Sequence, residues 1–251
     1  MAFALGTVFE MSDEPQLPAP PWQRAPRRTA RRRGEPITQE AIVAAALKLL
    51  DAQGLEALSM RRIADELGTG PASLYWHVGS KDGLLDLLFD AVIGEQDVPD
   101  PDPEHWQDQL REVARTMRAT ILGHRDIIRI SIGRIPMGPN ALRYSERVLA
   151  ILRTGGVPDQ LAVTGHLLLI AIVNGYTLDE TGEGGQPPAD QPPVDEAARM
   201  VRDFMTSLPA EHFPNLVAVA DQFTFTDPDQ RFEVLLDIYF EGLAKRASAA
   251  D

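Results

Sequence analysis

Residues 55–94 read LEALSMRRIADELGTGPASLYWHVGSKDGLLDLLFDAVIG, and they contain three short helical patterns in succession. The first two patterns are separated by a glycine-containing turn at 68–70, and the third begins with a Ser–Lys pair. Two short helices joined by such a turn are typical of a helix-turn-helix unit, whose second helix enters the major groove of DNA. The stretch therefore predicts a DNA-binding protein, with 71–78 as its recognition helix.

The charge of the chain is unevenly divided. The 251 residues carry a formal net charge of −13, which taken alone argues against a nucleic-acid partner. Residues 24–81 nevertheless sum to +4, whereas residues 82–251 sum to −14. Binding to phosphates requires positive charge at the contact surface rather than over the whole protein. The basic charge is thus located in the segment that contains the helix-turn-helix pattern.

Residues 1–36 are predicted to be a disordered, arginine-rich arm. Their later part is rich in proline, arginine and small polar residues, which cannot bury a core. A solvated tail is one interpretation of such a segment, but its position directly before the helix-turn-helix favours a DNA-contacting arm. The arm residues expected to contact DNA are Arg27, Arg28, Arg31, Arg32 and Arg33.

Apolar residues at helical spacing predict an all-α fold. Residues 37–94 are expected to form a three-helix helix-turn-helix domain with a connecting fourth helix, and Thr38, Ser59 and Ser80 are candidate N-caps. The proline-rich segment 97–103 predicts a boundary before a larger helical domain, 95–251. The expected helices are 38–53, 59–67, 71–78, 81–94, 104–122, 125–133, 139–154, 158–181, 194–207 and 228–246.

The chain resembles the tetracycline-repressor (TetR) family. The resemblance rests on IVAAALKLLDAQGLEALSM at 42–60, RRIADELG at 61–68 and SLYWHVGSKDGLLD at 73–86. HRD at 124–126 and NGYTL at 174–178 are similar to the tetracycline-repressor branch of that family. The resemblance implies a homodimeric repressor that binds a palindromic operator and is released by a small-molecule inducer, with 95–251 serving ligand binding and dimerisation.

The resemblance also implies which side chains contact operator DNA. Arg61 can form a forked pair of hydrogen bonds with guanine, and a Ser or Tyr hydroxyl can reach a base edge or a phosphate. Arg61 and Arg62 are both expected to point outward. The alternative, that Tyr75 and Trp76 are core aromatics, is weakened because Leu74 and Val78 already supply an apolar stripe. The expected DNA contacts are Arg61, Thr69, Ser73, Tyr75, Trp76, His77 and Lys81.

A mostly apolar ligand pocket is expected within 104–181. Family members that bind magnesium–tetracycline use two histidines, and Ser131 and Asp97 stand at the corresponding positions here. The resemblance therefore implies a largely apolar inducer that acts without metal, with Arg129 or Arg134 available for an acidic group. The residues expected to line the pocket, most of which could equally be core, are Trp106, Val113, Met117, Ile130, Arg134, Met137, Tyr144 and Asn174.

Two apolar helices are expected to form the homodimer interface. Residues 158–181 are apolar almost all round, and residues 228–246 carry a broad apolar stripe. Two such helices from each subunit can make an isologous four-helix interface, although packing within one subunit is an alternative.

Other classes of function find little support in the sequence. There is no cysteine, the histidines do not pair at i+3 or i+4, and no nucleotide or hydrolase motif is present, so we expect no metal, no cofactor and no enzyme. An enzyme with an appended helix-turn-helix and an effector-independent architectural DNA-binding protein remain the alternatives. No apolar run approaches the ~20 residues that span a bilayer, so we expect no membrane partner and a cytoplasmic protein.

Overall fold

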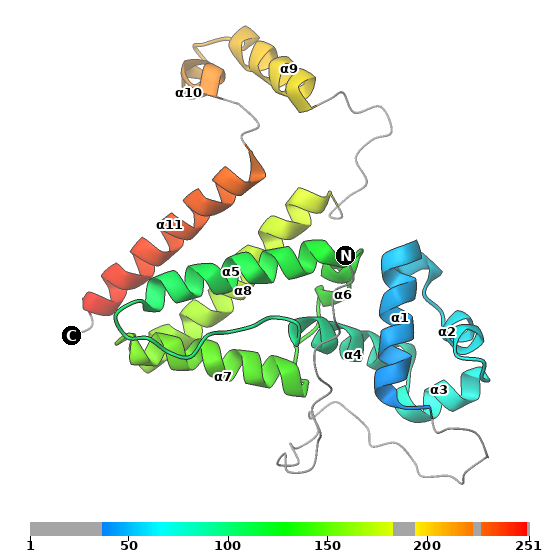
Figure 1. Ribbon diagram of the computed structural model, residues 1–251. Helices are drawn as coiled ribbons and strands as arrows, with labels where there is room; N and C mark the ends of the chain where they lie inside the picture. The colour runs from blue at the N-terminus through cyan, green and yellow to red at the C-terminus, as the bar shows by residue number, and fades with distance from the viewer. Residues whose placement is uncertain (1–36, 183–193, 223–226, 250–251) are drawn as a thin grey trace, which may run out of the picture.

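The computed structural model describes residues 37–182, 194–222 and 227–249, and in these residues the chain forms helices without a strand (Figure 1). The all-α fold expected from the sequence is confirmed. The predicted arm, with Arg27, Arg28, Arg31, Arg32 and Arg33, lies outside the described residues.

The N-terminal part has the helices that the sequence predicts. Their bounds are α1 Gln39–Gln53, η1 Leu55–Ala57, α2 Met60–Glu66, α3 Pro71–Val78 and α4 Lys81–Ile93. The three predicted caps are confirmed, because the side-chain oxygens of Thr38, Ser59 and Ser80 each accept a hydrogen bond from the amide three residues on. These helices pack around a hydrophobic core whose fully buried side chains include Ile42, Leu50, Ile63, Leu74, Leu84 and Leu88.

The C-terminal part is built around α5, α7 and α8, which contact one another, while α11 contacts α8 (Figure 1). The helix α4 contacts α1 and α3 on one side and α5, α6 and α7 on the other, so it belongs to both parts of the molecule. The bounds are α5 Trp106–Gly123, α6 Ile127–Ser131, α7 Pro139–Thr154, α8 Asp159–Thr181, α9 Val194–Ser207, α10 Pro214–Ala218, η2 Ala220–Gln222 and α11 Pro228–Ser248.

Two differences from the predicted helices have local causes. The helix expected at 125–133 is shorter, because Asp126 and Gly133 both adopt positive φ and so lie outside α6. The short elements η1, α10 and η2 were not predicted, since three to five residues are too few to show a helical period.

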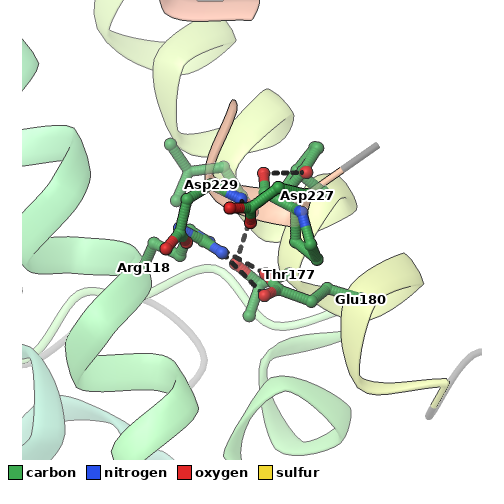
Figure 2. A network of polar contacts seen from close by, with 8 residues as sticks. Arg118, Thr177, Glu180, Asp227 and Asp229 are labelled. Atoms are coloured by element: carbon green, nitrogen blue, oxygen red, sulfur yellow. Dashed lines mark hydrogen bonds and ion pairs between the residues drawn. The ribbon is translucent and has the colours of Figure 1, made fainter. Parts of the chain in front are cut away.

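Three arginines of α5 connect it to α11, and we call them the arginine ladder (Arg111, Arg115 and Arg118). Arg111 pairs with Asp237 at 2.6 Å, and Arg115 forms two hydrogen bonds with Glu233, both of 2.8 Å. Figure 2 shows the third rung, where Arg118 lies between the α8 residue Glu180 and Asp229 at the start of α11.

Arg118 also lies over the ring of Phe232, with its guanidinium carbon 5 Å or less from the ring centre. Long side chains, rather than close backbone packing, therefore hold α11 against α5.

The helix α8 has 23 residues and contains an 18-residue window with a mean hydropathy of 1.7, so by length and composition it could cross a membrane. The sequence-based expectation that no run comes close to that length needs this correction. Thr164, His166 and Asn174 interrupt the run of apolar residues in α8, but the mean hydropathy stays high. A core helix of a soluble protein meets the same criterion, and the buried face of α8 packs against α5, α7 and α11.

Candidate DNA-binding surface and ligand site

The recognition helix α3 buries one side and exposes the other. Leu74 and Val78 are buried against the core, as the sequence predicts. Tyr75 and Trp76 are 46% and 44% exposed, so the alternative that they are core aromatics is wrong. Ser73 and His77 are partly buried, and the ring of His77 meets that of Trp76 edge to face. The side chains expected to contact DNA thus lie on an accessible surface.

Arg61 and Arg62 have different surroundings, although both were expected to point outward. Arg62 donates hydrogen bonds to the carbonyl of Ala57 and to Gln53, so its guanidinium holds η1 and α1 together. Arg61 is exposed at the start of α2 and makes no hydrogen bond or ion pair with any described residue. Of the two arginines, only Arg61 has a guanidinium without a partner among the described residues.

Lys81 is exposed in the first turn of α4, where unpaired backbone amides also favour an anion. The start of α4 lies tightly under the end of α3, because a Cβ on Gly83 would come within 2.3 Å of the Val78 carbonyl oxygen. Thr69 is partly buried in the turn before α3, where its amide bonds to the Ala64 carbonyl. The turn and the start of α4 therefore flank α3 at its two ends.

A buried polar cluster lies among α5, α7 and α8. The Tyr144 hydroxyl donates to the sulfur of Met117 at 3.8 Å, and burial raises the pKa of Tyr144. His166 lies beside Tyr144, with its Nε2 at 3.1 Å from the Ser145 hydroxyl. Burial lowers the pKa of His166, so its ring is neutral.

Two atoms of this region are buried without any hydrogen-bond partner, and both belong to α8. They are Nδ1 of His166 and Oδ1 of Asn174. Buried polar groups are nearly always paired in folded proteins, so an unpaired donor or acceptor marks a place where a water molecule, an ion or a ligand can supply the partner. Met117, Tyr144 and His166 therefore form our candidate ligand site, and Asn174, eight residues further along α8, is a candidate extension of it.

The other residues predicted to line the pocket are placed differently. Val113 and Ile130 are buried in the core, and Met137 is 37% exposed in the segment between α6 and α7. Trp106 packs against the end of α7, where a Cβ on Gly155 would meet its ring. The structure brings Met117 and Tyr144 into contact, and it does not bring Trp106 into the same cluster.

Neither Arg129 nor Arg134 is an uncommitted cation, so our expectation that one of them is available for an acidic ligand group is wrong. Arg134 pairs with Asp82 and Asp86 of α4, and Arg129 pairs with Glu56 and Asp126. Asp82, Asp86 and Glu56 are distant in sequence from the arginines they pair with, and helical periodicity cannot reveal such pairs.

His166 is a candidate site residue that sequence reasoning missed. From the sequence, the histidines were considered only as metal ligands, and their spacing argued against that role. The buried positions of α8, namely 162, 165, 166, 169, 173 and 177, form a single stripe at helical spacing. A histidine and a threonine inside an otherwise apolar stripe were the available indication of a polar site.

An exposed recognition helix on a small helical base, joined through α4 to a larger helical domain with a buried polar cluster, defines a helix-turn-helix transcription regulator. Two family patterns match the chain. "Bacterial regulatory proteins, tetR family" matches residues 42–88, and "Tetracyclin repressor-like, C-terminal domain" matches residues 98–247. The chain belongs to the TetR family of ligand-binding transcriptional repressors.

Named relatives are regulators as well. The chain is 42% identical over 120 residues to an HTH-type transcriptional regulator of Saccharopolyspora erythraea, a match that covers 48% of this chain and 51% of the relative. It is 31% identical over 213 residues to the class A tetracycline repressor of Escherichia coli, covering 84% and 92% of the two chains. The first of these matches thus spans about half of the relative's length.

Among solved structures, apo ActR from Streptomyces coelicolor matches with a TM-score of 0.78 and 45% identity, over 87% of this chain and all of that chain. ActR has also been solved with actinorhodin, and that complex matches with a TM-score of 0.75 over 84% of this chain and 99% of that chain. The whole fold, including the C-terminal domain, is therefore that of known TetR-family proteins.

Proposed function

We propose that the protein is a homodimeric repressor that binds a palindromic operator and is released by a small, largely apolar molecule. Residues 37–94 form the DNA-binding domain in this proposal, and 95–251 form the ligand-binding and dimerisation domain of a cytoplasmic protein. The observation that carries the proposal is the outer face of α3, where Tyr75 and Trp76 are exposed and Ser73 is partly exposed, together with the exposed and unpaired Arg61 at the start of α2.

A dimer is supported by apolar side chains left exposed on α8 and α11. Val163, Leu167 and Leu168 on α8 are at least half exposed, and on α11 Val234 and Ile238 are 53% and 70% exposed. The two helices also pack against each other, with the Tyr239 hydroxyl donating to the Gly165 carbonyl at 2.7 Å. The exposed apolar residues of α8 and α11 thus lie on two helices that already pack together. The same helices of a second copy could cover these residues and form a four-helix interface.

A two-fold dimer would present two α3 helices. They would reach successive major grooves on one face of the duplex, with half-site centres ~34–36 Å apart. A footprint with two equivalent half-sites, together with a dimer in sedimentation, is the expected result. Full-affinity occupation of one half-site by a monomer would contradict the proposal.

The ligand site is proposed at the buried cluster of Met117, Tyr144 and His166, with Asn174 further along α8 as its extension. An apolar ring system with a hydroxyl or carbonyl group would satisfy both the apolar walls and the unpaired atoms on α8. ActR, which is similar over its full length, has been solved with actinorhodin. We propose a ligand of that general kind for this chain.

Release of operator DNA across a compound panel, with and without EDTA, tests this assignment. Actinorhodin and tetracycline with magnesium belong in the panel. We expect release that does not depend on a divalent cation, because Ser131 and Asp97 replace the family's histidines. His166→Ala and Asn174→Ala should raise the concentration of compound needed for release without changing operator affinity. Release only by tetracycline with magnesium would contradict the proposed pocket.

A further inference from the structure

The DNA-binding helices contact the C-terminal domain at a second place besides α4. The loop between α5 and α6 meets the end of α1, and we call this contact the α1–α6 junction (Asp51, Leu55 and Glu56 with His124, Asp126 and Arg129). Asp126 accepts a hydrogen bond of 2.6 Å from the Leu55 amide, although 71 residues separate them. The Asp126 side chain lies so close to the backbone of Gly54 that a Cβ on Gly54 would lie 2.7 Å from a carboxylate oxygen of Asp126.

His124 is placed between two carboxylates at this junction. Its Nδ1 lies 3.1 Å from the nearer carboxylate oxygen of Asp51 in α1, and its Nε2 lies 2.9 Å from Glu95, just beyond α4. An ionised carboxylate only accepts hydrogen bonds, so both contacts are hydrogen bonds when both ring nitrogens carry a proton. The geometry therefore favours the charged imidazolium.

The surroundings favour that charge for a further reason. Asp51 lies in the last turn of α1 and Glu95 directly follows α4, so both carboxylates add to the negative ends of helix dipoles. Burial of the ring works against its charged form, but the hydrogen bonds and charges of Glu95 and Asp51 together raise the pKa of His124. The other charged groups at the junction are Arg125 and Asp126 on the same loop and Glu56, which pairs with Arg129.

Among the ion pairs of this junction, those of His124 are expected to contribute most to its stability. Its side chain is 16% exposed and has two partners, whereas the Arg129–Glu56 pair is much more exposed, and exposed pairs contribute little. A protein part connected through one helix can rotate about that helix. A second contact at α1 removes this freedom, because rotation of the DNA-binding helices about α4 would separate Asp51 from His124 of the C-terminal domain.

We propose that His124 is a positioning residue for DNA binding: its imidazolium, held between Asp51 and Glu95, fixes the orientation of the DNA-binding helices on the C-terminal domain. A neutral ring would turn one unprotonated nitrogen toward a carboxylate and loosen the junction. The orientation should therefore be well defined in mildly acidic and neutral solution and become variable as the pH rises through the raised pKa of His124.

The test measures a distance within one chain by pulsed electron spin resonance. The chain has no cysteine, so the double substitution Asp65→Cys and Thr154→Cys places spin labels only on exposed sites of α2 and at the end of α7. Dilution with unlabelled full-length protein leaves pairs within one chain as the reporters, whatever the oligomeric state. We expect one narrow distance distribution at about pH 6 that broadens at about pH 9.

Variants of His124 decide between positioning and a merely structural role. His124→Gln should broaden the distribution at both pH values, and His124→Arg, a permanent cation, should keep it narrow at both. If His124→Gln fails to fold, Asp51→Asn provides the same test with the histidine intact, and it should move the broadening to lower pH. His105→Gln is the matched control, because His105 is also paired with a carboxylate, Asp102, but in an exposed position.

Operator binding provides the functional readout. Wild-type affinity should fall more steeply between about pH 6 and about pH 9 than that of His124→Arg. Any pH effect that arises at the DNA-contacting surface itself is common to both proteins and cancels. A wild-type distribution that is unchanged over this pH range, or a His124→Arg protein that broadens like the wild type, would overturn the proposal.

Discussion

At the scale of single residues, the structure separates side chains that the sequence cannot tell apart. Arg61 and Arg62 are neighbours of the same type, yet Arg62 is bonded to Ala57 and Gln53 while Arg61 has no partner among the described residues. The difference arises from their directions on α2, where adjacent residues point about 100° apart. One guanidinium stabilises the domain, and the other remains available for DNA.

This difference predicts two distinct phenotypes. Arg61→Ala should weaken binding to the operator by ~1–3 kcal/mol while leaving binding to random DNA and thermal stability nearly unchanged. Arg62→Ala should lower thermal stability, by ~0.5–1.5 kcal/mol, with little effect on sequence preference. Competition binding and thermal melting of both variants provide the measurement. Equal losses of Arg61→Ala on cognate and random DNA would show that this residue does not contact bases.

Asp90 is a second residue whose role is visible only in three dimensions. It is a buried carboxylate of α4 that accepts hydrogen bonds from the amides of Asn140 and Ala141 at the start of α7. Gly138 leaves room for it, because a Cβ there would lie 2.2 Å from the carboxylate. Asp90 therefore caps α7 from another helix and fixes α4 against the C-terminal domain.

Asp90→Ala should cost ~1–3 kcal/mol of unfolding free energy, because it leaves buried amides without an acceptor. Asp90→Asn should cost less, since its carbonyl oxygen can still accept. Burial raises the pKa of Asp90, against the opposing hydrogen bonds from α7. The folded state thus holds this proton more tightly than the unfolded state, and the wild type should lose stability relative to Asp90→Asn as pH rises through the raised pKa. Urea denaturation over a pH series would reveal the opposite slope if the carboxylate were stabilised as a charge.

At the scale of helices, the arginine ladder determines how α11 is attached. Arg118 is 12% exposed, and its partner Glu180 is 17% exposed, so removal of the arginine leaves a carboxylate with little water. Tyr176 and Phe232 lose a stacked guanidinium in the same change. Arg118 is therefore a structural element of the α5–α8–α11 packing and not part of a solvated charge pattern.

Arg118→Ala should lower the unfolding free energy by ~3–5 kcal/mol, as expected when one partner of a mostly buried ion pair is removed. Arg118→Lys should recover only part of it, because an ammonium cannot bond both carboxylate oxygens of Glu180 in a planar fork. Arg153→Ala is the control, since Arg153 and Asp159 form an exposed pair worth ~0–1 kcal/mol. Equal chemical denaturation midpoints for Arg118→Ala and Arg153→Ala would contradict this account.

At the scale of the whole molecule, local patterns were predictable and long-range pairs were not. The helix caps at Thr38, Ser59 and Ser80 and the buried pair Leu74 and Val78 follow from short-range sequence rules, and the structure confirms them. Asp90 meets α7 across 50 residues or more, and His124 meets Asp51 across 73. No periodicity links such positions, so the contacts between the two halves of the molecule could not be read from the sequence.

The candidate functional sites likewise contain a part that the sequence predicts and a part that it does not. The exposed side of α3 followed from the helical period, because Leu74 and Val78 fix which face is buried. Of the predicted pocket residues, Met117 and Tyr144 meet, whereas Arg134 lies against α4 and Trp106 against the end of α7. Apolar side chains look alike in a pocket wall and in a core, so composition alone cannot separate the two.

Dimerisation makes a prediction that also belongs to this scale. Ile238→Asp on α11 should give a folded monomer with greatly reduced operator affinity, because a charge on the exposed stripe cannot be buried against a second copy. Ile135→Asp, at 69% exposure in the segment between α6 and α7, is the matched control and should remain dimeric. Sedimentation of both variants decides, and a dimeric Ile238→Asp would place the interface elsewhere.

The tryptophans offer an optical consequence of the two-part architecture. The sequence contains three, Trp22, Trp76 and Trp106, of which Trp22 lies outside the described residues. Trp76 is solvated on α3 and should fluoresce at long wavelength, whereas Trp106, pressed against Gly155, should emit toward the blue. In a Trp22→Phe protein the emission spectrum would therefore separate into two bands. Quenching of the red band would report operator binding, and a shift of the blue band would report changes in the C-terminal core, without any added dye.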